Sequence, residues 1–266
     1  MRVRGPLAFA LAGAALLLAA TAARAAALAP FEARYRLSLG GLTVGEMRLV
    51  LRTAGDGRYL YEMASRPRGL LALFRRDTLT ERSLWERGPD GAPRPLRYER
   101  IQTGSRERRA RLVFTWSADG SGRVRNEVAG RPWEMAVPPG TLDRLLVQLA
   151  LRRDLAAARE PLEYPVADGG KLKRYRFAVL GRETVTTPAG RFETVKIQRL
   201  RRKGKPPLYF WLAPRLGYLS VAGTRPGGEG GTVRMELVEI RPAPAASRQA
   251  SAESANGLRS TAGRGP

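Results

Sequence analysis

The side chains that could carry chemistry in this chain are carboxylates, lysine, tyrosine, serine and threonine, because its 266 residues include neither histidine nor cysteine. Thiol nucleophiles, imidazole acid–base catalysis and zinc sites built from Cys or His are therefore excluded. The candidate acids or bases are Glu134, Asp143 and Glu163, but their spacing singles out no catalytic pair. No Gly-x-Ser-x-Gly elbow, Ser-x-x-Lys pair or phosphate-binding glycine loop accompanies them. We expect a protein without catalytic residues, metal or cofactor.

Large aromatic residues are the candidate contacts for an apolar ligand. They are Phe74, Trp116, Trp133, Phe210 and Trp211. On the concave face of a curved sheet, such side chains line a cavity that suits an acyl chain. The alternative interpretation is that they fill an ordinary core. The apolar run 70–74, with arginines on both sides, also fits a loop at a membrane interface, or a buried strand with wet ends.

Two basic clusters are the candidate contacts for anions. The first contains Arg106, Arg108, Arg109 and Arg111, and the second surrounds a turn and contains Arg199, Arg201, Arg202, Lys203 and Lys205. Within the second cluster the predicted anion contacts are Arg201, Arg202 and Lys203. Arginine binds phosphate through paired hydrogen bonds, although charge runs are often only solvated faces. The formal net charge of +23 favours anionic partners.

The two ends of the sequence differ in composition from the rest. Arg2 and Arg4 precede an uncharged stretch at 7–23, and Ala23-Arg24-Ala25 fits an Ala-x-Ala cleavage site. We interpret residues 1–25 as a signal peptide and expect a periplasmic protein that meets no nucleic acid; an uncleaved membrane anchor is the alternative. Residues 242–266 contain no aromatic residue and predict a disordered tail. One folded domain, 30–241, is left.

Alternation of apolar and polar residues predicts that this domain consists of antiparallel strands. The alternating segments are 31–39, 46–52, 112–116, 174–179 and 233–237. Asp-Gly pairs predict type I′ hairpin turns between such segments, because this turn needs positive φ at both central residues. The pairs lie at 56–57, 90–91, 119–120 and 168–169. A further turn, Thr187-Pro188-Ala189-Gly190, predicts a hairpin between 184–187 and 191–200.

One segment has helical rather than strand periodicity. Its apolar residues are Leu142, Leu145, Leu146, Leu149 and Ala150. Thr141 is the predicted N-cap, and the helix is expected to end near Arg159, before Pro161. Many strands and one amphipathic helix predict a mainly β fold, a single antiparallel and strongly curved sheet (an open or half barrel) with the helix packed on it. A β-sandwich is the alternative.

Four motifs, in order and spacing, resemble the exported bacterial domain-of-unknown-function family 3108. They are Gly41–Glu46, Phe114-Thr115-Trp116, Thr187–Lys196, and Tyr209–Pro214 followed by Gly217-Tyr218. Thr115 and Ser220 depart from the family pattern, which favours Asp and Pro there. The resemblance implies a periplasmic, mainly antiparallel β protein without an established activity. More distantly, the Trp-containing hairpin is similar to those of the LolA/LolB lipoprotein carriers, whose half-barrel cradles acyl chains.

Together these patterns favour an exported, non-catalytic envelope protein that binds an apolar or amphipathic ligand, such as a lipid or the acyl chain of a lipoprotein, with peripheral membrane contact. The alternative is a structural or assembly factor that holds an envelope protein or an anionic polymer with its sheet edge and basic face. A hydrolase that uses carboxylates is a third hypothesis. Every hypothesis in which the protein holds a ligand requires an opening in its interior, which alternation patterns cannot show.

Overall fold

The computed structural model describes residues 29–69, 77–105, 107–226 and 231–243. The predicted signal peptide and nearly all of the predicted tail lie outside the described residues, as do Phe74, its apolar run and Arg106. Within the described ranges no helix is both long enough and apolar enough to cross a bilayer.

The described residues form a single antiparallel sheet of 14 strands. The first eight are β1 (Phe31–Leu39), β2 (Leu42–Gly55), β3 (Arg58–Pro67), β4 (Thr78–Arg87), β5 (Pro93–Thr103), β6 (Arg108–Trp116), β7 (Gly122–Asn126) and β8 (Trp133–Val137). The helix α3 (Val147–Ala156) follows. The remaining elements are β9 (Glu163–Ala167), β10 (Leu172–Thr187), β11 (Gly190–Leu200), β12 (Leu208–Ala213), the short 3-10 helix η1 (Pro214–Leu216), β13 (Leu219–Pro226) and β14 (Thr232–Pro242).

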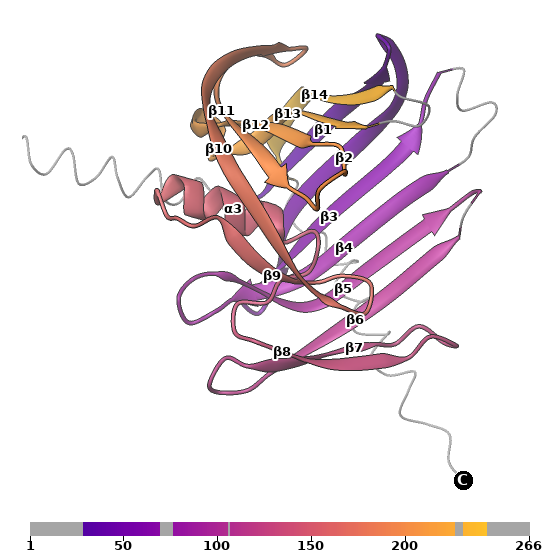
Figure 1. The fold of residues 1–266 in the computed structure, drawn as a ribbon, viewed down its shortest axis with the longest axis vertical. Coiled ribbons are helices and arrows are strands. Elements are labelled where there is room, and N and C mark those ends of the chain that lie inside the picture. Colours follow the sequence, from indigo (N-terminus) through magenta and orange to yellow (C-terminus); the bar gives the residue numbers. More distant parts are fainter. Residues whose placement is uncertain (1–28, 70–76, 106, 227–230, 244–266) are drawn as a thin grey trace, which may run out of the picture.

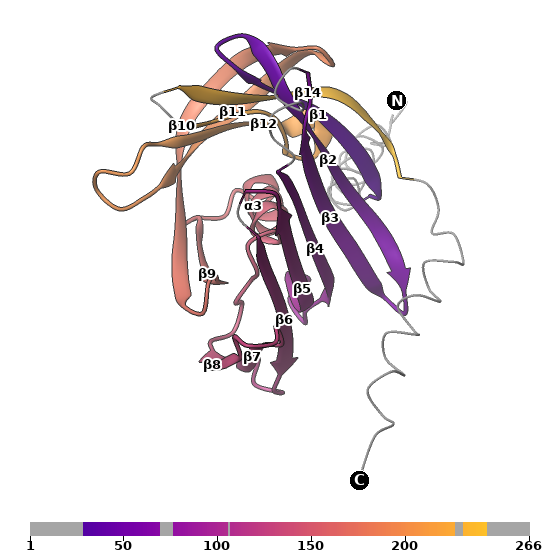
Figure 2. The same ribbon diagram turned by 90° about the vertical axis from the view of Figure 1, so that its right-hand side faces the viewer.

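The sheet runs in the order β8 to β1, then β14 down to β9, so that the first and last strands pair in its middle. It curls strongly, and α3 lies between β9–β10 on one side and β3–β4 on the other (Figures 1 and 2). The chain crosses from one sheet edge, β8, to the other, β9, through α3. The predicted curved sheet with a packed helix is confirmed, and the sandwich alternative is wrong because there is one continuous sheet.

Strand β1 shows how alternation gives the sheet an apolar inner face and a polar outer face. Phe31, Ala33 and Tyr35 are buried on the concave face. Arg34 and Arg36 point to the outer face, where they form ion pairs with Glu239 and Glu236 of the neighbouring strand β14. An apolar inner face must be removed from water, and a sheet bent around a helix achieves this without a second sheet.

The predicted turns all connect neighbouring strands, but they are not all of one type. Asp56 and Gly57 have φ of 48° and 72°, as a type I′ turn requires. In the other three Asp-Gly pairs only the glycine has a positive φ, so these pairs do not form the centre of a type I′ turn. In the hairpin between β9 and β10 the two central residues are instead Gly169 and Gly170, with φ of 65° and 74°. The hairpin around Pro188 is confirmed, with Thr187 of β10 opposite Gly190 of β11.

The helix begins five residues later than predicted, because its N-cap is Leu146 instead of Thr141. The reason is a long-range contact. Leu142 donates its N–H to the Pro165 carbonyl and accepts the N–H of Ala167, so its backbone is held extended against β9. Thr141 donates its hydroxyl to the Pro138 carbonyl and caps nothing.

Packing of α3 into the concave face forms a large part of the core. Its Leu149 side chain is 1 % exposed, and Leu145 and Leu146 just before the helix are fully buried. They meet buried aromatic residues of the sheet such as Trp85 and Tyr61 in one continuous cluster. The helix therefore takes the place that a second sheet has in a sandwich.

Shortening a core leucine of α3 tests this role of the helix. Leu149→Ala should lower the free energy of unfolding by about 2–5 kcal/mol, because it removes buried methyl groups and leaves a cavity. The matched control is Leu42→Ala, the same change at a side chain that is 73 % exposed, which should cost less than about 1 kcal/mol. Urea denaturation measures both, and equal losses would contradict a core role for α3.

Candidate functional site

An apolar cavity of about 270 Å³ lies between the concave face and α3. Four strands contribute pairs of residues two positions apart, which therefore share one face. These pairs are Met47 and Leu49, Tyr61 and Met63, Tyr175 and Phe177, and Phe210 and Leu212. Val147 and Leu151 close the cavity from the helix. Three methionines, Met47, Met63 and Met235, lie in the walls, and their flexible side chains adapt to ligands of different shape.

A second hollow, of about 480 Å³, lies beside Trp116 where β6, β7 and β8 meet. Its walls include Thr115, Ser117 and Arg123, so it is more polar than the apolar cavity. A third hollow of about 250 Å³ lies on the other side of the same tryptophan. Neither is enclosed by the helix. The apolar cavity is thus the better candidate for a small-molecule site, since such sites are mainly apolar with few polar groups.

Of the four predicted aromatic contacts that the structure describes, Phe210 alone lines the apolar cavity. Trp211, the next residue of β12, points to the opposite face, where its indole N–H donates to the Glu183 carboxylate and Lys196 lies over its ring. Trp116 donates its indole N–H to the Pro95 carbonyl at 2.8 Å. The ring of Trp133 lies against Gly170, near the seam between the two sheet edges. The structure does not bring these aromatic residues together.

The two basic clusters also lie apart from each other along the sheet. Arg108, Arg109 and Arg111 are exposed on β6, and Arg111 forms an ion pair with Glu99 at 3.0 Å. Arg201, Arg202 and Lys203 are exposed in the connection from β11 to β12. Eight strands separate β6 from β11 in the sheet order. Anion binding by either cluster remains a prediction.

The candidate carboxylates do not converge either. Glu134 pairs with Arg123 and Glu163 with Arg174, both at the surface. Asp143 is completely buried just before α3. Its carboxylate accepts the N–H groups of Leu145 and Leu146 and the Ser83 hydroxyl, so it fastens the start of the helix to β4. Burial raises the pKa of Asp143 to about 7, against the opposing effect of the Ser83 hydrogen bond. The described residues hold no group of three metal-ligating side chains.

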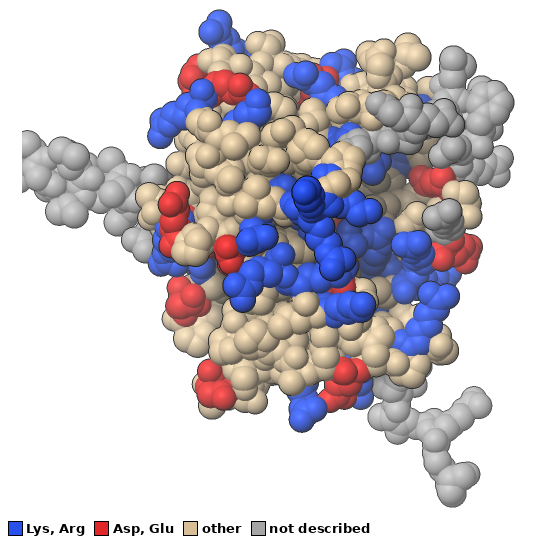
Figure 3. Space-filling view, in the orientation of Figure 1, with Lys and Arg blue, Asp and Glu red and all other residues tan. Residues whose placement is uncertain are grey.

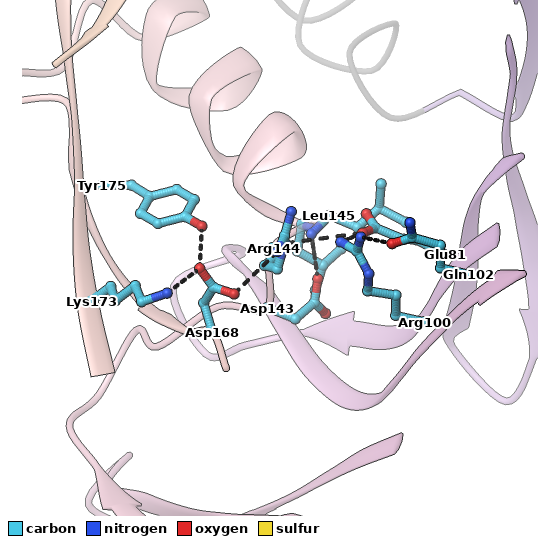
Figure 4. A network of polar contacts seen from close by, with 10 residues as sticks. Glu81, Arg100, Gln102, Asp143, Arg144, Leu145, Asp168, Lys173 and Tyr175 are labelled. Atoms are coloured by element: carbon cyan, nitrogen blue, oxygen red, sulfur yellow. Dashed lines mark hydrogen bonds and ion pairs between the residues drawn. The ribbon is translucent and has the colours of Figure 1, made fainter. Parts of the chain in front are cut away.

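A chain of polar contacts connects β10 with β4 (Figure 4), and two of its members, Arg144 and Tyr175, line the cavity. Asp168 accepts hydrogen bonds from Tyr175 at 2.9 Å and Lys173 at 2.8 Å, and pairs with Arg144 at 3.2 Å. Arg144 also approaches Glu81 at 4.0 Å. Burial acts to raise the pKa of Asp168, but its cationic neighbours and Tyr175 outweigh it and the pKa is lowered. The contacts tie β10 to β4 across the interior.

Glu81 continues this chain of contacts to the next strand. It accepts a hydrogen bond from Arg100 of β5 at 2.9 Å. The same Arg100 also donates to Gln102, so every charged group in the chain of contacts has a partner. This chain of polar contacts is therefore fixed, and it contains more cations than carboxylates.

Sequence reasoning missed the arginines that line the apolar cavity, Arg144 and Arg152, and did not separate Arg199 from its cluster. Arg199 lies opposite Phe177 in the register of β10 and β11, which places it on the concave face, unlike Arg201 and Arg202 in the following turn. The sequence did contain a signal for this: Arg199 lies two positions after the buried Ile197, so alternation places both side chains on the same face of β11.

The sequence model of the family described as "Protein of unknown function (DUF3108)" matches residues 34–238. No curated protein matches the sequence significantly. The crystal structure of a beta-barrel-like protein of domain of unknown function DUF1849 from Brucella abortus superimposes with a TM-score of 0.56 at 14% identity, covering 82% of this chain and 99% of that one. This likeness shows a shared barrel-like fold.

Two more distant structures have TM-scores well below that value. The hypothetical lipoprotein YmcC from Escherichia coli gives a TM-score of 0.26 at 10% identity, covering 91% of this chain and 100% of that one. A domain described as an outer membrane lipoprotein-sorting protein domain from Vibrio parahaemolyticus gives 0.25 at 7% identity, covering 90% and 97%.

The buried Asp143 carboxyl should make the free energy of unfolding depend on pH. Because its pKa is raised from 3.8 to about 7, its protonated form favours the fold, and this contribution is lost as pH rises from about 4 to 7. Unfolding free energies of the wild type and Asp143→Asn should be closest near pH 4. The wild type should then lose stability relative to the variant toward pH 8, by on the order of 2–4 kcal/mol. Parallel pH profiles in urea denaturation would contradict the buried, titrating carboxyl.

Proposed function

The chain belongs to the DUF3108 family, and we propose that it is an exported envelope protein that binds one apolar chain of an amphipathic molecule, such as a lipid or the acyl chain of a lipoprotein, without changing it chemically. The single observation that carries this proposal is the apolar cavity between the concave face and α3. A periplasmic location is proposed from the leader-like segment 1–25, whose basic start and Ala-x-Ala motif fit a signal peptide.

The size and walls of the cavity favour a single chain. Its volume of about 270 Å³ lies just below the range of drug-sized ligand sites, about 300–1,000 Å³. The apolar walls offer many dispersion contacts and few hydrogen bonds, which suits methylene groups. The three wall methionines can rearrange to admit chains of somewhat different length.

The contacts of the candidate carboxylates support a function without catalysis. Glu134 and Glu163 form surface ion pairs, and neither lines the apolar cavity. Asp143 is occupied by the two backbone N–H groups and Ser83. Glu81 and Asp168 are each paired with more than one partner. These carboxylates are used in holding the structure, so we assign none of them to catalysis.

Filling the cavity should block binding of a neutral apolar probe. Met235→Trp places a large ring in the cavity wall and should weaken binding of N-phenyl-1-naphthylamine at least tenfold. Val238→Trp is the matched control, because Val238 lies on the same strand, β14, and is exposed outside the cavity. Fluorescence titration measures both affinities, and thermal melts confirm that both variants fold. Equal affinities for the two variants would show that the probe binds elsewhere.

Native mass spectrometry tests whether a ligand is present after expression. The protein expressed with its leader and purified without detergent should carry a bound species that dissociates as a lipid on activation. Met235→Trp should lack it, whereas Val238→Trp should retain it. A ligand-free wild type that also fails to bind the neutral probe would refute the lipid proposal, and a co-purified protein would favour the assembly-factor alternative.

A further inference from the structure

Three arginines line a cavity whose other walls are mainly apolar, namely Arg144, Arg152 and Arg199. An apolar chain offers a guanidinium group neither a hydrogen-bond acceptor nor a negative charge. Placing this group beside apolar walls also costs solvation free energy. The three side chains differ in how many of their hydrogen-bond donors the protein already uses.

Arg144 and Arg152 are both occupied by the protein. Arg144 pairs with Asp168 and lies near Glu81. Arg152, on α3, is 5 % exposed. It donates from Nε to the Gly217 carbonyl at 2.8 Å and from Nη2 to the Leu216 carbonyl at 3.3 Å, which fixes the turn after η1 to the helix. Only Nη1 of Arg152 is without a hydrogen-bond partner, so the protein already uses two of its three nitrogens.

Arg199 is different because its guanidinium has no acceptor anywhere in the described part of the chain. The guanidinium carbon lies 3.4 Å from the centre of the Tyr175 ring, so that the ring holds the group in place. Its Nε is buried without a hydrogen-bond partner. The side chain as a whole is only partly buried. Arg199 therefore combines a fixed position, unused donors and access to solvent at the cavity.

The charges around Arg199 do not neutralise it. Its stacking partner Tyr175 donates to Asp168, and that carboxylate already has Arg144 and Lys173 as cationic partners. The second carboxylate of the chain of polar contacts, Glu81, is paired with Arg100. The two carboxylates, Asp168 and Glu81, are therefore outnumbered by four cationic side chains: Arg100, Arg144, Lys173 and Arg199. Figure 3 shows lysine and arginine side chains gathered at the centre of one face of the molecule, with mostly uncharged surface above and below them.

We propose that the ligand of the apolar cavity carries an oxyanion headgroup, a carboxylate or a phosphate, and that Arg199 binds this headgroup while the apolar chain lies between α3 and the sheet. This inference rests on the proposed function, since it names the class of amphipathic molecule that the cavity takes. A charge-assisted hydrogen bond from Arg199 to the oxyanion satisfies donors that the protein leaves unused. A neutral head, such as an alcohol, cannot compensate the positive charge.

Three ligands that share a twelve-carbon chain but differ in their headgroup distinguish the contribution of the headgroup to binding from that of the chain. Dodecanoate, dodecyl phosphate and dodecanol compete with N-phenyl-1-naphthylamine for the wild type, Arg199→Met and Arg225→Met. The wild type should bind at least one of the two anions at least tenfold more tightly than dodecanol. Arg199→Met should lose this preference while its affinity for dodecanol stays within about twofold. Arg225→Met, the same change at an exposed arginine of β13 that does not line the cavity, should keep the preference.

The outcomes distinguish this inference from the proposed function. Equal binding of all three ligands to the wild type, or an anion preference that survives Arg199→Met, would overturn the role of Arg199 and leave the apolar cavity in place. Failure of every ligand and of the neutral probe would overturn the proposed function, and the inference with it. The stronger of the two anions identifies the head as carboxylate or phosphate. Thermal melts check folding, and Arg199→Gln replaces Arg199→Met if the latter unfolds.

Discussion

The packing of α3 into the concave face is the interaction on which the rest of the structure depends. A sheet of 14 strands with one apolar face has to hide that face from water, and it has two open edges, β8 and β9. The segment that joins those edges supplies the helix, the backbone contact of Leu142 with β9 and the polar chain through Arg144. Curvature, core and cavity therefore have one common origin. The cavity is the volume that the helix does not fill.

Local patterns predicted the strands and most turns because their causes are local. Alternation places Phe31 and Tyr35 inside and Arg34 outside whatever the partner strand is. The start of the helix was predicted wrongly because a contact with Pro165, more than twenty residues away, holds Leu142 extended. Propensity carries no information about such a contact. The individual strands of such a fold can thus be predicted from local sequence, and the predictions are wrong where segments distant in sequence make contact.

The candidate site was less predictable, for a physical reason. A cavity is defined by residues that face each other across the interior, and one sequence does not say which strands meet there. Even so, alternation alone could have separated Phe210 from Trp211, since neighbours on a strand face opposite ways. The same rule could have set Arg199 apart from Arg201. Aromatic type was the weaker guide, and the position of a residue within its strand was the stronger one.

The pairing of β1 with β14 has a consequence for how the chain reaches this structure. The strands from β1 to β8 and from β9 to β14 form two meanders in which each strand pairs with its neighbour in sequence, so each half can assemble through nearby hairpins. The two meanders pair along β1 and β14, where for example Arg34 lies opposite Glu239, 205 residues along the chain. That step requires closure of a very long loop, which slows folding and exposes unpaired strand edges meanwhile. Until β14 has been synthesised, the edge of β1 that it covers in the native sheet has no partner strand.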